Sequence, residues 1–182
     1  KNVQFVGKLI KMDAKDIHVL IKIKVYKLIR YSIFVLILFC LDRLSKIYII
    51  ELAEKTSISE IYLTSFLNSY LVWNTGIAFG LFSFSSEFTY NLFTAVIILI
   101  NLIIIYLVVI TKDFRKYFFL MILGGSFGNL FDRLYYESVP DFIDFHIGNF
   151  HWFIFNIADI FITAGVICLI LAEVLYKKDT NE

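Results

Sequence analysis

The stretch YNLFTAVIILINLIIIYLVVI, Tyr90–Ile110, carries no charged residue and consists almost entirely of aliphatic and aromatic side chains. A helix needs about 20 mostly apolar residues to cross the hydrocarbon core of a bilayer. Three further stretches approach this length and character, although each contains a few charged or polar residues: Ile29–Ile50, Tyr117–Leu134 and Phe153–Tyr176. The sequence therefore predicts an all-α integral membrane protein with four transmembrane helices.

The composition of the whole chain agrees with a membrane protein. Of the 182 residues, 59% are hydrophobic and 18% are charged, and the mean hydropathy is +0.78. An average soluble domain has roughly 25% charged residues, and a short chain has too much surface to hide so many apolar side chains from water. These values exclude a disordered protein and an ordinary water-soluble domain.

Basic residues mark one side of the predicted membrane protein. Residues 1–30 carry eight Lys and Arg residues against two Asp residues, and the loop 111–116 carries three basic residues. The segments 51–89 and 134–152 are instead net acidic. The positive-inside rule therefore places both termini in the cytoplasm and the two acidic segments on the outer face. We expect the basic arm to face the membrane and not to bind nucleic acid.

The chain is expected to form one membrane domain with short flanking segments. The parts are a basic cytoplasmic N-terminal arm (1–28), a four-span membrane domain (29–176) and a cytoplasmic tail (177–182). Segment 51–89 is rich in Ser, Thr, Asn and aromatic residues and contains the turn signal Asn74-Thr75-Gly76, which predicts a small β element on the outer membrane face. Pro140 disfavours helix at the preceding residue and predicts an extended turn in the second acidic segment.

Ionisable residues near the outer ends of the predicted helices form clusters. Asp42 and Lys46 share one helix face at i, i+4 spacing. The block GGSFGNLFDR, 124–133, places Asn129, Asp132 and Arg133 on one stripe, and its glycines Gly125 and Gly128 allow close helix approach. Each cluster also has a structural interpretation, as an ion pair or a packing face.

A further cluster begins the last predicted span. In the block FNIAD, 155–159, Asn156 and Asp159 share a helix face, and Ala158 lies between them. A carboxylate inside a span is costly, so it is either paired with a cation such as Arg133 or functional.

Five carboxylates are therefore expected near one membrane face: Asp42, Asp132, Asp141, Asp144 and Asp159. Two carboxylates that share a desolvated site cannot both ionise easily, so one becomes an acid while its partner remains a base. Such a pair can activate water and protonate a leaving amine without a cofactor, which is the chemistry of aspartic proteases. Spacing alone does not show which two form the pair.

The same outer segments allow two other kinds of site. Ser126 with His146 or His151 would give a Ser–His dyad, and Asp141, Asp144 and the two histidines would give a metal site of the kind that Zn or Fe prefers. Spacing favours neither, and we expect no metal and no cofactor.

The sequence is also compatible with two functions other than proteolysis. A small transporter or proton-conducting subunit could use Asp159, Asp132 and Arg133 as a relay, but it would need polar groups through the full depth of the bilayer. A membrane scaffold would tolerate Asp-to-Asn changes throughout.

Five blocks, in order, resemble the lipoprotein signal peptidase family, the bacterial signal peptidase II. The resemblance covers roughly residues 30–176 and rests on these blocks: Asp42 with Lys46, NTGIAF (74–79), GGSFGNLFDR (124–133), DFIDF (141–145) and FNIAD (155–159). The chain departs from the family in its basic arm and in Pro140, where the family often has Val.

The resemblance implies a membrane aspartic endopeptidase whose catalytic pair is Asp141 and Asp159. It implies removal of signal peptides from prolipoproteins, by cleavage on the amino side of a diacylglyceryl-modified Cys at the outer face of the cytoplasmic membrane. The implied substrate-binding residues are Asn74, Asn129, Arg133 and Asn156. The implied supporting residues are Asp42, Lys46, Gly125, Gly128, Asp132 and Ala158. We expect membrane lipid around the protein and a monomeric state.

Overall fold

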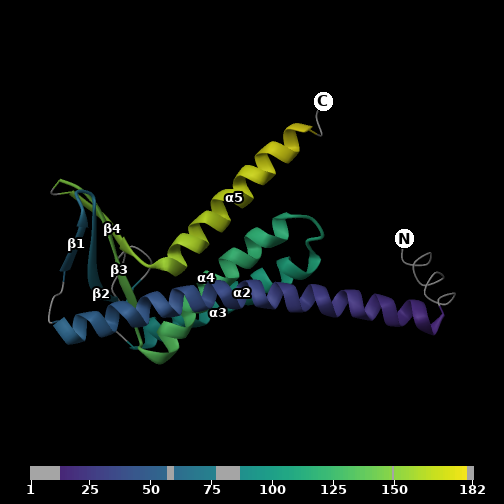
Figure 1. Cartoon of the computed structure of the whole chain (residues 1–182), viewed down its shortest axis with the longest axis horizontal. Coiled ribbons are helices and arrows are strands. Elements are labelled where there is room, and N and C mark those ends of the chain that lie inside the picture. The colour runs from purple at the N-terminus through teal and green to yellow at the C-terminus, as the bar shows by residue number, and fades with distance from the viewer. Residues whose placement is uncertain (1–12, 57–59, 77–86, 149, 180–182) are drawn as a thin grey trace. The chain divides into compact units, whose positions relative to one another are not determined.

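The computed structural model describes residues 13–56, 60–76, 87–148 and 150–179 (Figure 1). It divides into two compact units, Lys1–Phe34 and Val35–Glu182. The first helix contributes residues to both units, and all other elements belong to the second. The elements, in chain order, are α2 (Ala14–Thr56), β1 (Glu60–Thr64), β2 (Leu67–Asn74), α3 (Glu87–Ile110), α4 (Arg115–Tyr135), β3 (Val139–Ile147), β4 (Phe150–Phe155) and α5 (Ile157–Asp179).

The prediction of a mostly helical protein with a small β element is confirmed, since each of the four predicted stretches contains a helix. Among the described residues, α3 and the Ile157–Leu175 part of α5 are long and apolar enough to cross a membrane, with mean hydropathies of 3.0 and 2.3. Helices α2 and α4 carry more charged side chains. Length and composition therefore support two spans.

One helix extends beyond its predicted span, and one predicted helix start is wrong. Helix α2 contains the predicted span Ile29–Ile50 and begins at Ala14, where Asp13 caps it: the Asp16 backbone N–H donates to Asp13 Oδ1 over 2.8 Å. The last helix starts at Ile157 instead of Phe153, because Phe153–Phe155 continue strand β4.

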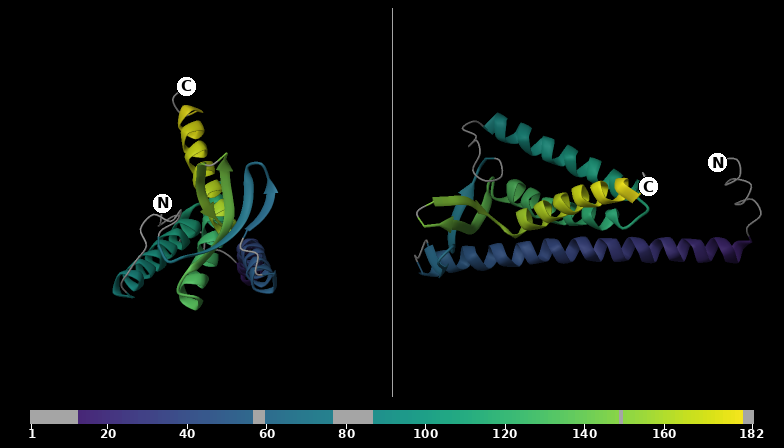
Figure 2. Two further views of the ribbon diagram at one scale, coloured as in Figure 1. Left: turned by 90° about the vertical axis from the view of Figure 1, so that its left-hand side faces the viewer. Right: turned by 90° about the horizontal axis from the view of Figure 1, so that it is seen from above.

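The four strands form one antiparallel sheet in the order β1-β2-β3-β4 (Figure 2). Strands β1 and β2 confirm the β element predicted within 51–89. Strands β3 and β4 were not predicted, although Pro140 does lie in extended backbone at the start of β3. A short loop joins β3 to β4, and its Gly148 has φ +59°, which a residue with a side chain rarely adopts. The hairpin leads directly into α5.

A small apolar core joins the helices of the second unit. Ile104 of α3 packs with Ile122 and Leu123 of α4, and side chains of α2 and α5 surround them. Many other apolar side chains on these helices are exposed, for example Leu99 at 58% and Val109 at 71%. Exposed apolar surface of this extent is typical of helices that face lipid.

Candidate active site

Asp141 lies at the start of β3 and is held by two amides. Asn74, the last residue of β2, donates from Nδ2 to Asp141 Oδ2 over 2.8 Å, and Asn156 donates from Nδ2 to Oδ1 over 2.6 Å. The Asp141 residue is only 3% exposed. Burial, followed by the negative charge of Asp159, raises the pKa of Asp141 from 3.8 to about 6.

Asp159 lies in the first turn of α5, where it forms a reciprocal cap with Asn156. The Asn156 backbone N–H donates to Asp159 Oδ2, and the Asp159 backbone N–H donates to Asn156 Oδ1, each over 3.1 Å. This arrangement satisfies backbone donors that a helix start leaves open. It explains why the sequence places an amide and a carboxylate three residues apart before an apolar run.

Asn156 therefore joins the two carboxylates that the resemblance implied. Its side chain contacts Asp141 and the Asp159 backbone, its own backbone N–H contacts the Asp159 carboxylate, and it is fully buried. The structure brings Asp141 and Asp159 to one site from two elements, β3 and α5.

Asn129 links Asp159 to a buried cation. From α4, Asn129 Nδ2 donates to Asp159 Oδ1 over 2.8 Å, and its Oδ1 accepts from Lys46 Nζ over 2.8 Å. Lys46 also donates to Asp42 Oδ2 (2.9 Å) and Asp132 Oδ2 (2.7 Å), so all three of its protons are used. Lys46 thereby fixes which end of the Asn129 amide faces Asp159.

Asp42 supports the first turn of α5 from α2. Its Oδ1 accepts the Ala158 backbone N–H over 3.0 Å. A carboxylate near a helix N-terminus also interacts favourably with the helix dipole. Ala158 is fully buried at this contact.

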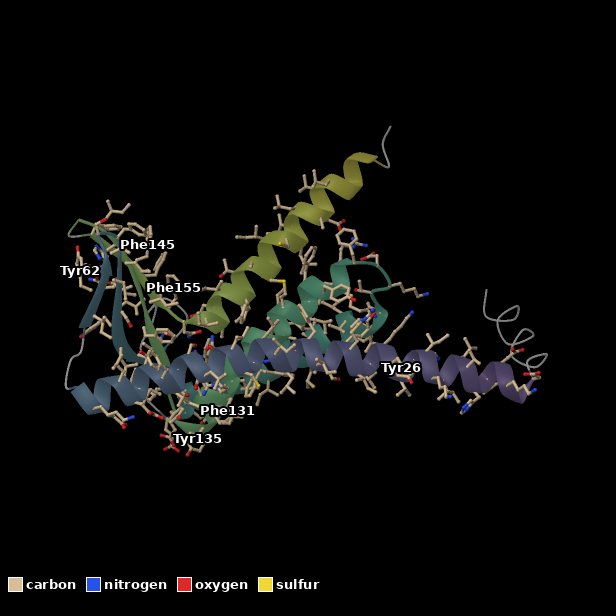
Figure 3. All side chains as sticks on the ribbon, in the orientation of Figure 1. Tyr26, Tyr62, Phe131, Tyr135, Phe145 and Phe155 are labelled. Carbon is tan, nitrogen blue, oxygen red and sulfur yellow. The ribbon has the colours of Figure 1, made fainter. Side chains whose placement is uncertain are left out.

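Arg43 is a site neighbour that the sequence analysis missed. Its guanidinium lies 2.6 Å from Asp132 Oδ1 and 3.1 Å from Asp42 Oδ2. It also lies 5.0 Å from the ring centroid of Phe131, which stacks on Tyr135 along α4 (Figure 3). Its position directly after Asp42 is the sequence signal that indicates a place in this cluster. With Lys46, Arg43 balances two buried carboxylates with two cations.

The two glycines of the α4 block have separate contacts. A Cβ on Gly125 would overlap the backbone carbonyl oxygen of Ala158, and a Cβ on Gly128 would overlap the Asp42 carboxylate. Gly125 therefore lets α4 approach the first turn of α5, and Gly128 lets it approach α2.

Arg133 carries unused donors. Its Nη2 donates to the Gly76 backbone oxygen over 2.8 Å, but its Nε and Nη1 are buried without a hydrogen-bond partner among the described residues. The residue is 6% exposed. Unsatisfied buried donors are costly, so this guanidinium is suited to binding an acceptor that the described residues do not provide. Residues 77–79 of the NTGIAF block lie outside the described residues.

Asp144 does not join the carboxylate pair. It is buried on β3, and its Oδ2 lies 2.7 Å from His151 Nδ1. Among the described residues, both ring nitrogens of His146 lack a hydrogen-bond partner, so His146 is not bonded to Ser126. Within the described part of the chain, no group of three or more His, Cys, Asp or Glu residues is arranged to hold a metal ion.

Two polar residues elsewhere in the predicted spans, Asn101 and Glu173, each have a partner away from the site. Asn101 of α3 donates to the Ile97 backbone oxygen over 3.0 Å, and Glu173 of α5 pairs with Arg115 over 2.7 Å. Neither residue belongs to the hydrogen-bonded cluster of Asp42, Lys46, Asn129, Asp132 and Asp159.

Comparison with known proteins agrees with this geometry. The family model for signal peptidase (SPase) II matches residues 34–175. The lipoprotein signal peptidase of Pelagibacter ubique (strain HTCC1062) is 51% identical over 151 residues, which cover 82% of this chain and 91% of that protein. The lipoprotein signal peptidase of Anaplasma marginale (strain Florida) is 39% identical over 143 residues, covering 78% and 82%.

Two solved structures, both described as bacterial membrane enzymes, share the fold. One has a TM-score of 0.66 at 26% identity and covers 84% of this chain and 91% of its own. The other has a TM-score of 0.62 at 30% identity and covers 79% and 91%. The match over most of the chain and the high identity to lipoprotein signal peptidases show that this chain belongs to the signal peptidase II family of membrane aspartic peptidases.

Proposed function

We propose that this signal peptidase II, which removes signal peptides from prolipoproteins, uses Asp141 and Asp159 as its catalytic pair. One observation carries the proposal: both carboxylates are buried and both are bonded to Asn156. Burial and the negative charge of Asp159 raise the pKa of Asp141, so one carboxyl can hold a proton while the other is ionised. The pair then offers a base and an acid at the same site.

The proposed reaction needs one water molecule. The ionised carboxylate takes a proton from water, whose oxygen attacks the scissile carbonyl carbon, while the protonated carboxyl gives its proton to the carbonyl oxygen. Collapse of the tetrahedral diol breaks the C–N bond. The carboxyl that took the water proton gives it to the leaving amine, and the other carboxylate takes a proton from the diol hydroxyl that becomes the new carbonyl, which restores the starting pair. The products are the signal peptide carboxylate and a new amino terminus at the diacylglyceryl-modified Cys.

Arg133 is proposed to bind the substrate main chain. Its Nε and Nη1 donors, which have no partner among the described residues, are matched to carbonyl oxygens, and Gly76 already accepts from the third guanidinium nitrogen. Asn74, Asn129 and Asn156 would hold the carboxylates in position for this substrate. Asp42, Lys46, Asp132, Gly125, Gly128 and Ala158 would support the first turn of α5.

We place this site near the outer face of the bacterial cytoplasmic (inner) membrane. The basic arm (1–28) and the basic loop 111–116 support cytoplasmic termini and four spans within residues 29–176, with a cytoplasmic tail at 177–182. The substrate would arrive through lipid as a diacylglyceryl-modified prolipoprotein. We propose that the enzyme acts as a monomer, without a metal or cofactor.

The test is cleavage of a purified diacylglyceryl-modified prolipoprotein by Asp141→Asn, Asp159→Asn and Asp144→Asn variants. Asp144 is a matched control because it lies on the same strand as Asp141 and is equally buried, at 3% exposed. We expect the first two changes to reduce kcat by roughly 10³-fold or more, and the third to leave it near the wild-type value.

Substantial activity in the Asp141→Asn variant or the Asp159→Asn variant would contradict the assignment. Asp132→Asn separates stability from chemistry, because Asp132 pairs with the cations Lys46 and Arg43 and not with the catalytic pair. An unmodified prolipoprotein that is cleaved equally well would contradict the proposed requirement for diacylglycerol.

A further inference from the structure

The N-terminal part of α2, residues 14–30, presents an unusual surface. Every side chain from Lys15 to Arg30 is exposed, including large apolar ones such as Leu28 at 65% and Tyr26 at 69% (Figure 3). A helix with this much exposed apolar surface is stabilised by a partner that covers it.

Basic residues spread over more than half of the circumference of this helix, and one narrow stripe is purely apolar. At about 100° per residue, Lys22, Lys24, Lys27 and Arg30 spread over one side of about 200°. The apolar residues Ile17, Ile21, Val25 and Leu28 fill a stripe of about 80° on the other side. Exposed apolar residues also lie among the cations, for example Val19, Ile23 and Tyr26. A polybasic segment of this kind beside a span is typical of sites that attract anionic lipid.

The four cations have no carboxylate nearby on their helix. No acidic residue occurs between Asp16 and Asp42, and Asp16 belongs to the first turn, where its backbone is capped by Asp13. Their partners along the helix are therefore apolar, and their charge is available to an external anion.

Sequence position places these cations beside a predicted span. Lys22, Lys24 and Lys27 immediately precede the stretch Ile29–Ile50, and Arg30 lies at its first turn. If Ile29–Ile50 crosses the bilayer, Lys22 to Arg30 pass through the headgroup layer.

We propose that Lys22, Lys24, Lys27 and Arg30 bind the phosphates of anionic phospholipids, which would hold this segment at the membrane surface. Long basic side chains reach headgroups while their stems remain in apolar surroundings. Each cation near an anionic surface strengthens binding by roughly fivefold at low salt. The inference does not depend on the catalytic assignment.

The test uses the full-length protein in nanodiscs of phosphatidylcholine, with or without phosphatidylglycerol. Amide hydrogen exchange of residues 14–30 should slow by roughly fivefold or more when the anionic lipid is present, and salt should weaken the effect. A variant with Lys22, Lys24, Lys27 and Arg30 all changed to Gln should lose this response and retain peptidase activity in detergent. The matched control exchanges Lys for Arg and Arg for Lys at the same four positions and should keep the response.

Equal exchange in both lipids would overturn the proposal, as would a Gln variant that still responds to phosphatidylglycerol. Protection that requires two protein copies in one nanodisc, regardless of lipid, would instead assign the apolar stripe to self-association and would also overturn it.

Discussion

Asn156 has two separable tasks at the residue scale, and two substitutions can divide them. Its side-chain oxygen caps α5, and its side-chain amide donates to Asp141. Ser keeps a side-chain oxygen that can cap α5, but its short side chain cannot also donate to Asp141. Ala loses both contacts. We expect Asn156→Ser and Asn156→Ala to lose kcat equally, while the Ser variant is more stable by about 1 kcal/mol.

Cleavage kinetics and thermal unfolding in detergent measure the two effects. A Ser variant with wild-type kcat would show that the amide donor to Asp141 is dispensable. Equal stability of the two variants would remove the capping role.

The raised pKa of Asp141 has a consequence for stability. The folded carboxyl has a pKa of about 6 instead of 3.8, so between these pH values the folded state binds a proton that the unfolded chain has lost. Stability from this group is therefore full below about pH 4 and falls as pH rises through about 6.

Asp141→Asn removes this titration. We expect the wild-type unfolding temperature to fall relative to that of the variant between pH 4 and pH 7, measured in one detergent at constant ionic strength. Parallel curves for the two proteins would contradict a raised Asp141 pKa.

At the scale of elements, the contact between α4 and α5 sets the position of Asp159. A methyl group at Gly125 would push on the Ala158 carbonyl, one residue before Asp159. A methyl group at Gly165 would meet Ile122 Cγ1 at 2.7 Å and the Phe118 backbone oxygen at 2.8 Å, at the same helix contact but two turns from the site.

Gly125→Ala should therefore lower kcat by roughly 10- to 100-fold, because small displacements of a catalytic group are costly. Gly165→Ala should destabilise the fold by about 1–3 kcal/mol through overpacking and leave kcat unchanged. Cleavage assays at a temperature where both variants are folded make the comparison. Equal kcat losses would show that helix packing in general, and not the first turn of α5, controls activity.

The elements also show what the sequence could and could not predict. The helices followed from long apolar runs, and the Asp159 cluster followed from the cost of a carboxylate inside such a run. Strands β3 and β4 were missed because apolar runs such as FHWFIF have no period that separates a strand from the start of an adjoining helix. The Asn156–Asp159 cap was readable as an amide three residues before an acid.

The contacts that complete the site are long-range, and spacing gives no access to them. Lys46 and Asn129 are 83 residues apart in sequence, and Ala158 and Asp42 are 116 apart. Their partners depend on how α2, α4 and α5 pack. The pairing of Asp141 with Asp159 could therefore be implied by family resemblance, but not worked out from periodicity.

At the scale of the whole molecule, the proposed orientation can be tested by cysteine labelling. The positive-inside rule puts the loop 111–116 in the cytoplasm and the β3–β4 hairpin outside. Lys112 and Phe150 are both exposed and lie in these two segments. In a background with Cys40→Ser and Cys168→Ser, we expect a membrane-impermeant maleimide to label the Phe150→Cys variant in intact cells and to label Lys112→Cys only after permeabilisation.

This result would decide whether α4 crosses the membrane. Helix α4 is the helix between Lys112 and Phe150, so if these two positions lie on opposite sides, α4 must span the membrane despite its charged residues. Labelling of both variants in intact cells would place both loops outside and remove α4 from the set of spans.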